Sequence, residues 1–243
     1  MPLLETRSGY PVSSDDVHMN VLAVVTRKGG SGKTTLAAHL AVEADRAGAG
    51  PVGLIDTDPQ GSLREWWAAR ADQSPLFMRS TPSRLNDAIV EFRKRNVRLV
   101  VIDTQPSSSK AMARAVKQSD LVLVPVRPSP HDIRLMGATV DVVEPLGKPL
   151  VFVLNAATRG ARLTSQAVTF LSQHGPLAPT IIHNRVSFAS SMIDGRTAME
   201  VSGAMAASDE IARLWDYLDA RLDGRIYRPR TPAISRASPD PRG

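Results

Sequence analysis

The chain contains no cysteine among its 243 residues. This absence excludes disulfide bonds, thiolate metal sites and iron–sulfur clusters, and it is compatible with a reducing cytoplasm. No apolar run approaches the roughly eighteen residues of a membrane-spanning helix, and residues 1–18 lack the basic start and apolar stretch of a signal peptide. The histidines are scattered without the spacing of metal ligands. We therefore expect a soluble, cytoplasmic protein with no cysteine or histidine metal site.

Positive charge is concentrated at the C-terminal end of the chain. The formal net charge is +6, and residues 221–243, with six arginines and two aspartates, contribute +4 of it. Residues 224–243 contain too few apolar side chains to build a core, so we expect a disordered basic tail. Two interpretations of this tail stay open: an electrostatic arm for DNA, or a solubilising extension with no further role.

Apolar strands and amphipathic helices alternate between the N-terminal extension, residues 1–18, and the tail. Strands are predicted at 19–26, 52–56, 98–103, 120–126, 149–154 and 179–183, and helices at 33–47, 62–71, 82–96, 108–118, 131–146, 163–174 and 206–223. Thr81-Pro82 and Ser129-Pro130 are expected to start two of the helices, and Ser208 to cap the last. Strands this apolar are buried on both faces, so residues 19–223 are predicted to form an α/β domain, with a mostly parallel, twisted sheet, helices on both faces and one substantial core.

A glycine-rich segment joins the first predicted strand to the first predicted helix. It reads Lys28-Gly29-Gly30-Ser31-Gly32-Lys33-Thr34-Thr35, the order of a phosphate-binding loop. Its glycines leave backbone N–H groups open to phosphate oxygens, and the helix N-terminus favours anions. Lys33 is expected to reach the β- and γ-phosphates, the Thr34 hydroxyl to bind Mg²⁺, and Thr35 to bond the α-phosphate. Arg27 stands where the ordinary loop has its first glycine, and Lys28 is one lysine more than a single loop needs.

This K-G-G-x-G-K-T-T segment resembles the deviant P-loop of the ParA/MinD family of ATPases. Residues 54–62, L-I-D-T-D-P-Q-G-S, look like the family's switch I region, and residues 100–106, V-V-I-D-T-Q-P, look like its Walker B and switch II region. In the latter, Gln105 stands where many members have the first of two prolines, while Asp103 is kept. The resemblance covers about residues 19–222 and extends, through segments 119–130, 184–189 and 193–195, to the small partition-type ParA proteins of the ParF-like group.

The resemblance implies a role for each residue of the site. Lys28 is expected to cross a dimer interface and touch the nucleotide held by the partner subunit, and Asp103 to orient a metal-bound water. Asp58 is our candidate for positioning the attacking water, with Asp56 next. Asn155, at the end of a predicted strand, is a candidate for the adenine edge, although an asparagine there is also a common turn former.

The family's cycle implies a function for the whole chain. ATP with Mg²⁺ makes a sandwich homodimer, the dimer binds nonspecific DNA over the nucleoid, and a ParB-type partner stimulates an otherwise slow hydrolysis, so that a plasmid or chromosome origin is partitioned. From the charge distribution we expect the DNA contacts to come from arginines that two paired subunits align, namely Arg213, Arg221, Arg225, Arg228 and Arg230.

Other functions compete with this one. The same DNA-binding ATPase could position a protein cargo, such as a carboxysome or a chemoreceptor cluster, and the sequence does not separate the two. A P-loop metabolic enzyme of the dethiobiotin synthetase type shares the fold but has no need of Lys28. A MinD-like membrane ATPase would end in a basic amphipathic helix, whereas prolines interrupt this C-terminus, so no membrane partner is expected. Relatives of the nitrogenase iron protein need cysteines and are excluded.

Overall fold

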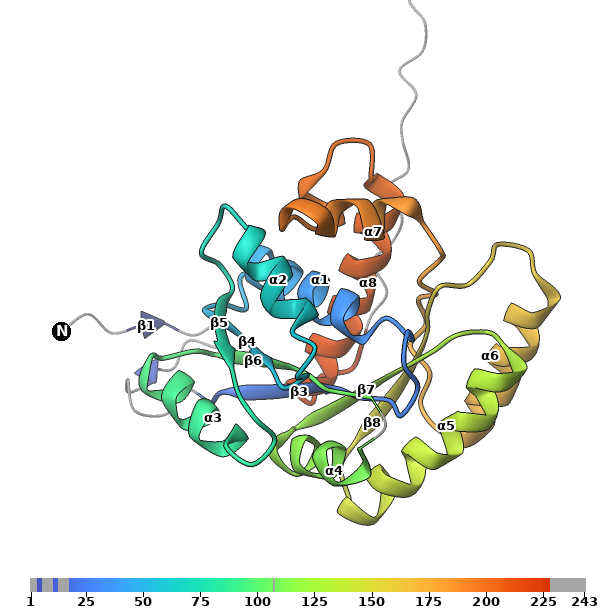
Figure 1. Ribbon diagram of the computed structural model, residues 1–243, viewed down its shortest axis with the longest axis horizontal. Coiled ribbons are helices and arrows are strands. Elements are labelled where there is room, and N and C mark those ends of the chain that lie inside the picture. Colours follow the sequence, from blue (N-terminus) through green and yellow to red (C-terminus); the bar gives the residue numbers. More distant parts are fainter. Residues whose placement is uncertain (1–3, 6–10, 13–17, 107, 228–243) are drawn as a thin grey trace, which may run out of the picture.

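A six-stranded parallel sheet forms the centre of the protein (Figure 1). The computed structural model describes residues 4–5, 11–12, 18–106 and 108–227. The strands follow the order β5 (Leu76–Arg79), β4 (Val52–Asp56), β6 (Leu99–Asp103), β3 (Asn20–Val24), β7 (Leu121–Val126) and β8 (Leu150–Leu154). A separate antiparallel pair joins β1 (Leu4–Glu5) and β2 (Pro11–Val12). The predicted fold class, a parallel sheet in an α/β P-loop fold, is confirmed.

Helices cover both faces of the sheet, as Figure 1 shows. One face carries α1 (Lys33–Arg46), α2 (Ser62–Ala69), α7 (Val186–Ser191) and α8 (Met205–Leu222). The other carries α3 (Leu85–Lys94), α4 (Ser109–Gln118), α5 (Pro130–Val143) and α6 (Arg162–His174). Short 3₁₀ turns lie at Glu144–Leu146, Met192–Asp194 and Ala198–Glu200. The expected core is therefore divided by the sheet into two layers.

Successive side chains along each strand point to opposite faces of the sheet and so contribute to both layers of the core. Leu22 and Val24 of β3 point into the layer under α1 and α8, whereas Val21 and Ala23 point into the layer under α3 to α6. Every residue of β4, β6 and β7 is buried, which is why these strands read as continuous apolar runs. Trp215 of α8 is 2% exposed, as expected of a core residue.

The structure differs from the predicted secondary structure in three places. Residues 179–183 form no strand: the chain runs beside β8 with isolated bridges at Leu177 and His183, because Pro176 and Pro179 have no N–H to donate to a ladder. The edge strand β5 was not predicted; it is four residues long and half-exposed, so its apolar signal is weak. The short helix α7 was also not predicted.

The helix starts are partly as predicted. Ser129 caps α5, with its hydroxyl accepting from the N–H of Asp132 at 3.1 Å and Pro130 in the first turn. However, α3 begins at Leu85 after an uncapped Arg84, and the hydroxyl of Thr81 instead bonds Ser83. Likewise α8 begins at Met205, so Ser208 lies inside the helix and does not cap it.

Parallel register brings the ends of three strands to one edge. Asp103 at the end of β6 is opposite Val24 of β3 on one side and Asp56 of β4 on the other. The P-loop leaves β3 at the same edge. In α/β sheets this carboxyl edge is where ligands bind.

No helix in the described ranges is long and apolar enough to cross a membrane. The predicted tail beyond Tyr227 and most of the N-terminal extension lie outside the described residues.

One histidine is buried inside the layer under α1. His39 of α1 is fully buried; its Nδ1–H donates to the carbonyl of Thr35 at 2.8 Å, and its Nε2 accepts from the N–H of Ala198 at 3.0 Å. The ring is therefore neutral, and burial lowers its pKa to about 4.

This histidine predicts a pH dependence of folding. Between pH 6.5 and about 4 the unfolded chain protonates His39 while the folded chain does not. The free energy of unfolding should therefore decrease as the pH is lowered through this window, by roughly 3 kcal/mol from this group. Urea unfolding from pH 7.5 to 5 should show a shallower dependence for His39→Gln than for wild type. The exposed His174→Gln is the control; identical slopes in all three proteins would contradict the prediction.

Candidate nucleotide-binding site

The P-loop, residues 28–35, is held in a shape that glycine permits. Gly30 and Gly32 have φ of 71° and 92°, in the left-handed region. A Cβ on Gly32 would lie 2.2 Å from Nδ2 of Asn155, so no side chain fits there. The loop ends at α1, whose first-turn N–H groups have no intrahelical acceptor and are open to an anion.

Lys33 lies under the loop. Its side chain is buried, and Nζ donates to the carbonyl of Lys28 at 3.2 Å, which closes the loop around the ammonium group. Burial lowers the pKa of Lys33, and the charges of Asp103 and Asp58 oppose that shift. The charge predicted to meet the phosphates is thus fixed within the loop itself.

Thr34 and Asp103 form the metal-facing pair. The Thr34 hydroxyl donates to Oδ2 of Asp103 at 2.7 Å, while the buried Oδ1 has no hydrogen-bond partner among the described residues. Burial raises the pKa of Asp103 to about 7. A hard cation that prefers oxygen ligands suits a hydroxyl and a carboxylate with a free oxygen. The two residues therefore fit Mg²⁺, held with water and nucleotide oxygens.

The two switch I aspartates have different surroundings. Asp56 is fully buried, and its carboxylate accepts from the backbone N–H groups of Asp58 at 2.9 Å and Arg64 at 3.2 Å. Its pKa is raised by burial. Asp58 is half-exposed, accepts from the N–H of Gln60 and lines the pocket beside the P-loop. Asp56 thus holds the switch backbone, and Asp58 is the carboxylate that faces the pocket.

These elements line a pocket of about 630 Å³. The P-loop and the first turn of α1 form one wall, and switch I with the start of α2 forms another. The expected site residues that line it are Gly30, Gly32, Lys33, Thr34, Thr35 and Asp58.

The same pocket is lined by residues that the sequence analysis did not name as site residues: Gln60, Ser62, Glu65, Trp66, Pro106, Arg127, Met192 and Ile193. Arg127 directly follows β7 at the carboxyl edge of the sheet, a position from which it could have been proposed. Met192 and Ile193 lie far along the chain, and the resemblance of residues 193–195 to the ParF-like group was the only signal for them.

Asn155 supports the loop. It is buried at the end of β8, and its Nδ2 donates to the carbonyl of Ser31 at 2.6 Å. It does not line the pocket beside Lys33. The adenine contact stays a prediction, whereas the observed bond fixes the P-loop to the sheet.

Lys28 differs from Lys33 although both belong to one loop. Its backbone N–H donates to Thr26, and its carbonyl accepts from Ser31 and Lys33. The residue is half-exposed, and its ammonium group makes no hydrogen bond or ion pair within the described ranges. The side chain is thus available outside its own subunit.

The expected DNA-binding arginines have local partners. Arg213 pairs with Asp209 at 2.9 Å, and Arg225 pairs with Asp219 at 2.5 Å and Asp223 at 2.9 Å. The guanidinium of Arg221 lies 5.4 Å from the ring of Tyr217. Arg228 and Arg230 lie outside the described residues.

Comparison with known proteins identifies the family. The model of the CobQ/CobB/MinD/ParA nucleotide-binding domain matches residues 22–198. This span is most of the chain, so the chain belongs to that family and is a ParA/MinD-type ATPase.

Individual relatives agree with the assignment. "Maintenance of carboxysome distribution protein A" of Halothiobacillus neapolitanus is 29% identical over 205 residues, 79% of this chain and 93% of that protein. Protein ParA of Rhizobium radiobacter is 32% identical over 128 residues, 51% of this chain and 56% of that protein. The structure of the septum site-determining protein MinD of Pyrococcus horikoshii, complexed with Mg-ADP, has a TM-score of 0.69 at 15% identity, over 83% of this chain and 96% of that one. The predicted family, fold and cofactors, ATP and Mg²⁺, are confirmed.

The buried position of Lys33 predicts the effect of its removal. Lys33→Ala should weaken ATP binding by roughly a hundredfold or more, because the β- and γ-phosphates lose their charge-assisted donor. Calorimetric titration with Mg-ATP measures this. Lys94→Ala, which removes an equal charge from the surface of α3, should bind as wild type does. Unchanged affinity in Lys33→Ala would contradict the assignment of the P-loop.

Proposed function

We propose that the chain is a partition-type ParA ATPase, which forms an ATP-dependent sandwich homodimer, binds nonspecific DNA, and hydrolyses ATP slowly until a ParB-type partner stimulates it. The observation that carries the proposal is Lys28. Its backbone carbonyl accepts from Lys33, while its ammonium group has no partner among the described residues. A free lysine beside an otherwise complete phosphate site suits the nucleotide of a second subunit.

The site's own residues account for a slow reaction. Lys33 and the loop amides would hold the phosphates, and Thr34 and Asp103 would hold Mg²⁺, which would supply charge neutralisation. Asp58 faces the pocket and would orient the attacking water. Phosphoryl transfer depends on positioning and on charge stabilisation by the protein. A carboxylate such as that of Asp58 is a weak general base. Turnover is therefore slow until the switch and Lys28 are brought into place.

Two interpretations of the cargo remain, and one comparison favours the second. Plasmid or chromosome partition agrees with the ParA relative and with the ParF-like motifs. Yet the relative matched over most of its own length, 93%, is named for carboxysome distribution. The second candidate function is thus positioning of a protein cargo by the same ATPase cycle over the nucleoid.

A distinct test concerns Lys28. Lys28→Ala should still bind ATP, since the contacts of its backbone remain, but should fail to dimerise because the partner's phosphates lose a cation. Light scattering after size exclusion, with and without Mg-ATP, measures this. Arg27→Ala removes the same charge one residue earlier and should still dimerise. A normal ATP-dependent dimer in Lys28→Ala would exclude the sandwich that depends on it.

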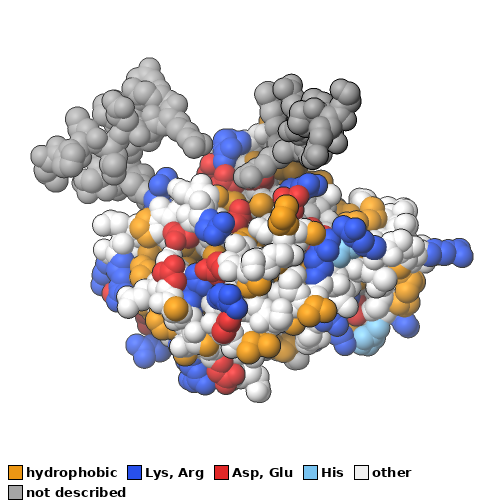
Figure 2. All heavy atoms as spheres, turned by 90° about the horizontal axis from the view of Figure 1, so that it is seen from above, with side chains coloured by type: hydrophobic (Ala, Val, Ile, Leu, Met, Phe, Trp, Pro, Cys, Tyr) orange, Lys and Arg blue, Asp and Glu red, His pale blue; other side chains and the backbone are white. Residues whose placement is uncertain are grey.

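The proposed DNA surface includes helix α8. Helix α8 carries Arg213 and Arg221 but also Asp209, Glu210, Asp216 and Asp219. Figure 2, seen from above, has blue and red side chains intermixed rather than one basic patch. Helix α8 of one subunit therefore carries no net positive charge, and binding should need two subunits together with the arginines beyond Tyr227.

This charge distribution predicts DNA binding that requires ATP and falls steeply with salt, whatever the DNA sequence. Replacing Arg221, Arg225, Arg228 and Arg230 with alanine should weaken binding and flatten the salt slope while leaving basal ATPase activity nearly unchanged. Anisotropy titrations at several salt concentrations, with and without ATP, measure both effects.

The control removes four charges elsewhere: Lys110, Arg114 and Lys117 on α4, and Lys148 before β8, all replaced with alanine. It should keep most of the affinity and the slope. An equal or larger loss in the control would move the DNA surface to the face of α4. No binding by the wild type would favour the metabolic enzyme.

A further inference from the structure

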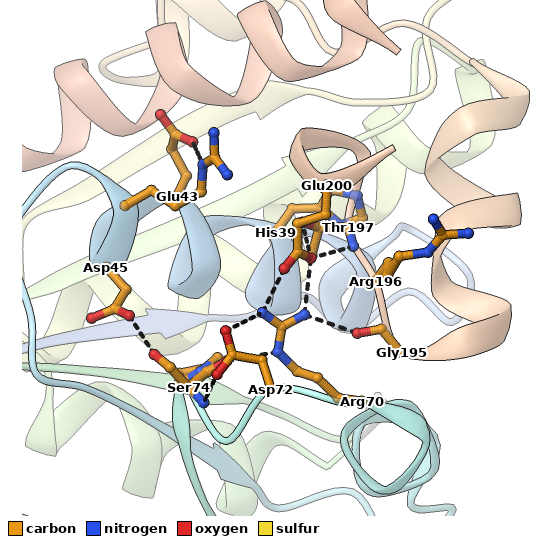
Figure 3. A network of polar contacts seen from close by, with 12 residues as sticks. His39, Glu43, Asp45, Arg70, Asp72, Ser74, Gly195, Arg196, Thr197 and Glu200 are labelled. Carbon is orange, nitrogen blue, oxygen red and sulfur yellow. Dashed lines mark hydrogen bonds and ion pairs between the residues drawn. The ribbon is translucent and has the colours of Figure 1, made fainter. Parts of the chain in front are cut away.

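A buried arginine ties the end of the switch I helix to a turn far along the chain (Figure 3). Arg70 follows α2, and its side chain is only 4% exposed. Its guanidinium donates to the Glu200 carboxylate at 2.7 and 2.9 Å, to the carbonyl of Gly195 at 2.9 Å and to that of Ser74 at 2.6 Å. Charge-assisted, bidentate hydrogen bonds of this kind are stronger than neutral ones and fix the orientation of both side chains.

Glu200 is the node of the network. Besides Arg70 it accepts from the N–H and the hydroxyl of Thr197, both at 2.8 Å, which makes a capping box around the turn Ala198–Glu200. Burial alone would raise the pKa of Glu200, but the hydrogen bonds from Arg70 and Thr197 outweigh it and lower the pKa. The carboxylate is therefore charged and fixed in direction.

The same turn is attached to the P-loop helix. The N–H of Ala198 donates to His39, and the opposite nitrogen of that ring donates to the carbonyl of Thr35. Thr35 lines the nucleotide pocket. A neutral histidine thus bridges the turn to the residue expected to meet the α-phosphate.

Two more contacts join the turn to α2. Nε1 of Trp66 donates to the carbonyl of Arg196 at 2.9 Å. A Cβ on Gly195 would lie 2.3 Å from the backbone nitrogen of Arg70, so the two backbones touch. Met192 and Ile193, just before this turn, and Trp66 itself line the pocket. The segment 192–200 therefore contacts both walls of the nucleotide pocket.

We propose that Arg70, Glu200 and His39 are positioning residues that couple the P-loop helix to the switch I helix through the segment 192–200. Helix α2 is fixed at its start by Asp56, which accepts from Arg64, and at its end by Arg70. Asp58 lies in the loop just before α2. We call this network of Arg70, Glu200, His39 and the segment 192–200 the brace. With nucleotide bound in the P-loop, the brace holds the Asp58 carboxylate at the distance from the γ-phosphate that hydrolysis needs. Without the brace, the pocket still binds nucleotide, but the carboxylate is misplaced.

The inference rests on the proposed ATPase, and its first test is kinetic. Glu200→Gln keeps the shape of the side chain and removes its charge, and Arg70→Gln removes the other partner. Each should lower kcat by roughly ten- to a hundredfold, because a small misplacement of a catalytic group costs that much. The affinity for Mg-ADP should change by less than about threefold, since P-loop contacts persist. Arg95→Gln, from the exposed pair of Glu91 with Arg95 at the end of α3, should match wild type.

The double variant Arg70→Gln/Glu200→Gln tests whether the two act as one unit. It should lower kcat no further than either single variant, because each single change already opens the brace. Losses that multiply in the double variant would overturn the proposal. So would wild-type kcat in variants whose unfolding midpoint is lowered, since the network would then be structural only. Should Arg70→Gln fail to fold, Glu200→Gln alone decides on the same criteria.

Hydrogen exchange supplies a readout that needs bound nucleotide but no turnover. In wild type, Mg-ADP should slow exchange at residues 33–36, at Ala198 and at residues 62–69. In Arg70→Gln, which has no bond to Ala198, the slowing at 33–36 should remain and that at 62–69 should be lost. Equal slowing at 62–69 in both proteins would overturn the inference. If the wild type binds nucleotide without hydrolysing it, the proposed function fails while this measurement still decides the coupling.

Discussion

The hydrogen bond between Thr34 and Asp103 connects the two halves of the site, and the rest of the structure holds it in place. It joins the first turn of α1 to the end of β6 at 2.7 Å. It can form only because β3 and β6 are parallel and in register, so that the P-loop and Asp103 leave the sheet at the same edge. Burial of both sheet faces fixes that register, because a slip by one residue would turn each strand's side chains into the wrong layer.

Sequence predicted the parts of the site that local chemistry determines. The P-loop glycines, Lys33 and Thr34 form one continuous motif, Asp103 ends an apolar strand, and Asp58 lies two residues beyond another. The structure adds what no local pattern encodes. Arg70 and Glu200 are separated by 130 positions, and neither has a sequence context that distinguishes it from a surface charge. The edge strand β5 and the irregular segment 176–183 were missed or misassigned because partial burial and proline weaken the period of two.

Asn155 illustrates how one residue type admits two roles. A strand-end asparagine was consistent with an adenine contact or with a turn. In the structure its amide fixes the carbonyl of Ser31, and the same amide leaves no space for a side chain at Gly32. The glycine and the asparagine are therefore one constraint, seen in the sequence as two unrelated residues.

The two lysines of the P-loop have different surroundings. Lys33 is buried near Asp103 and Asp58, whose negative charges favour its ionised form against the cost of burial. Lys28 shares none of this network through its side chain. Under the proposed function, a single subunit would hold its own phosphates and leave the charge of Lys28 unused, while the proposed coupling through Arg70 would tie Asp58 to the same loop. A second subunit that engaged Lys28 would pull on the loop whose position the brace transmits, and hydrolysis would then respond to dimerisation rather than to nucleotide alone.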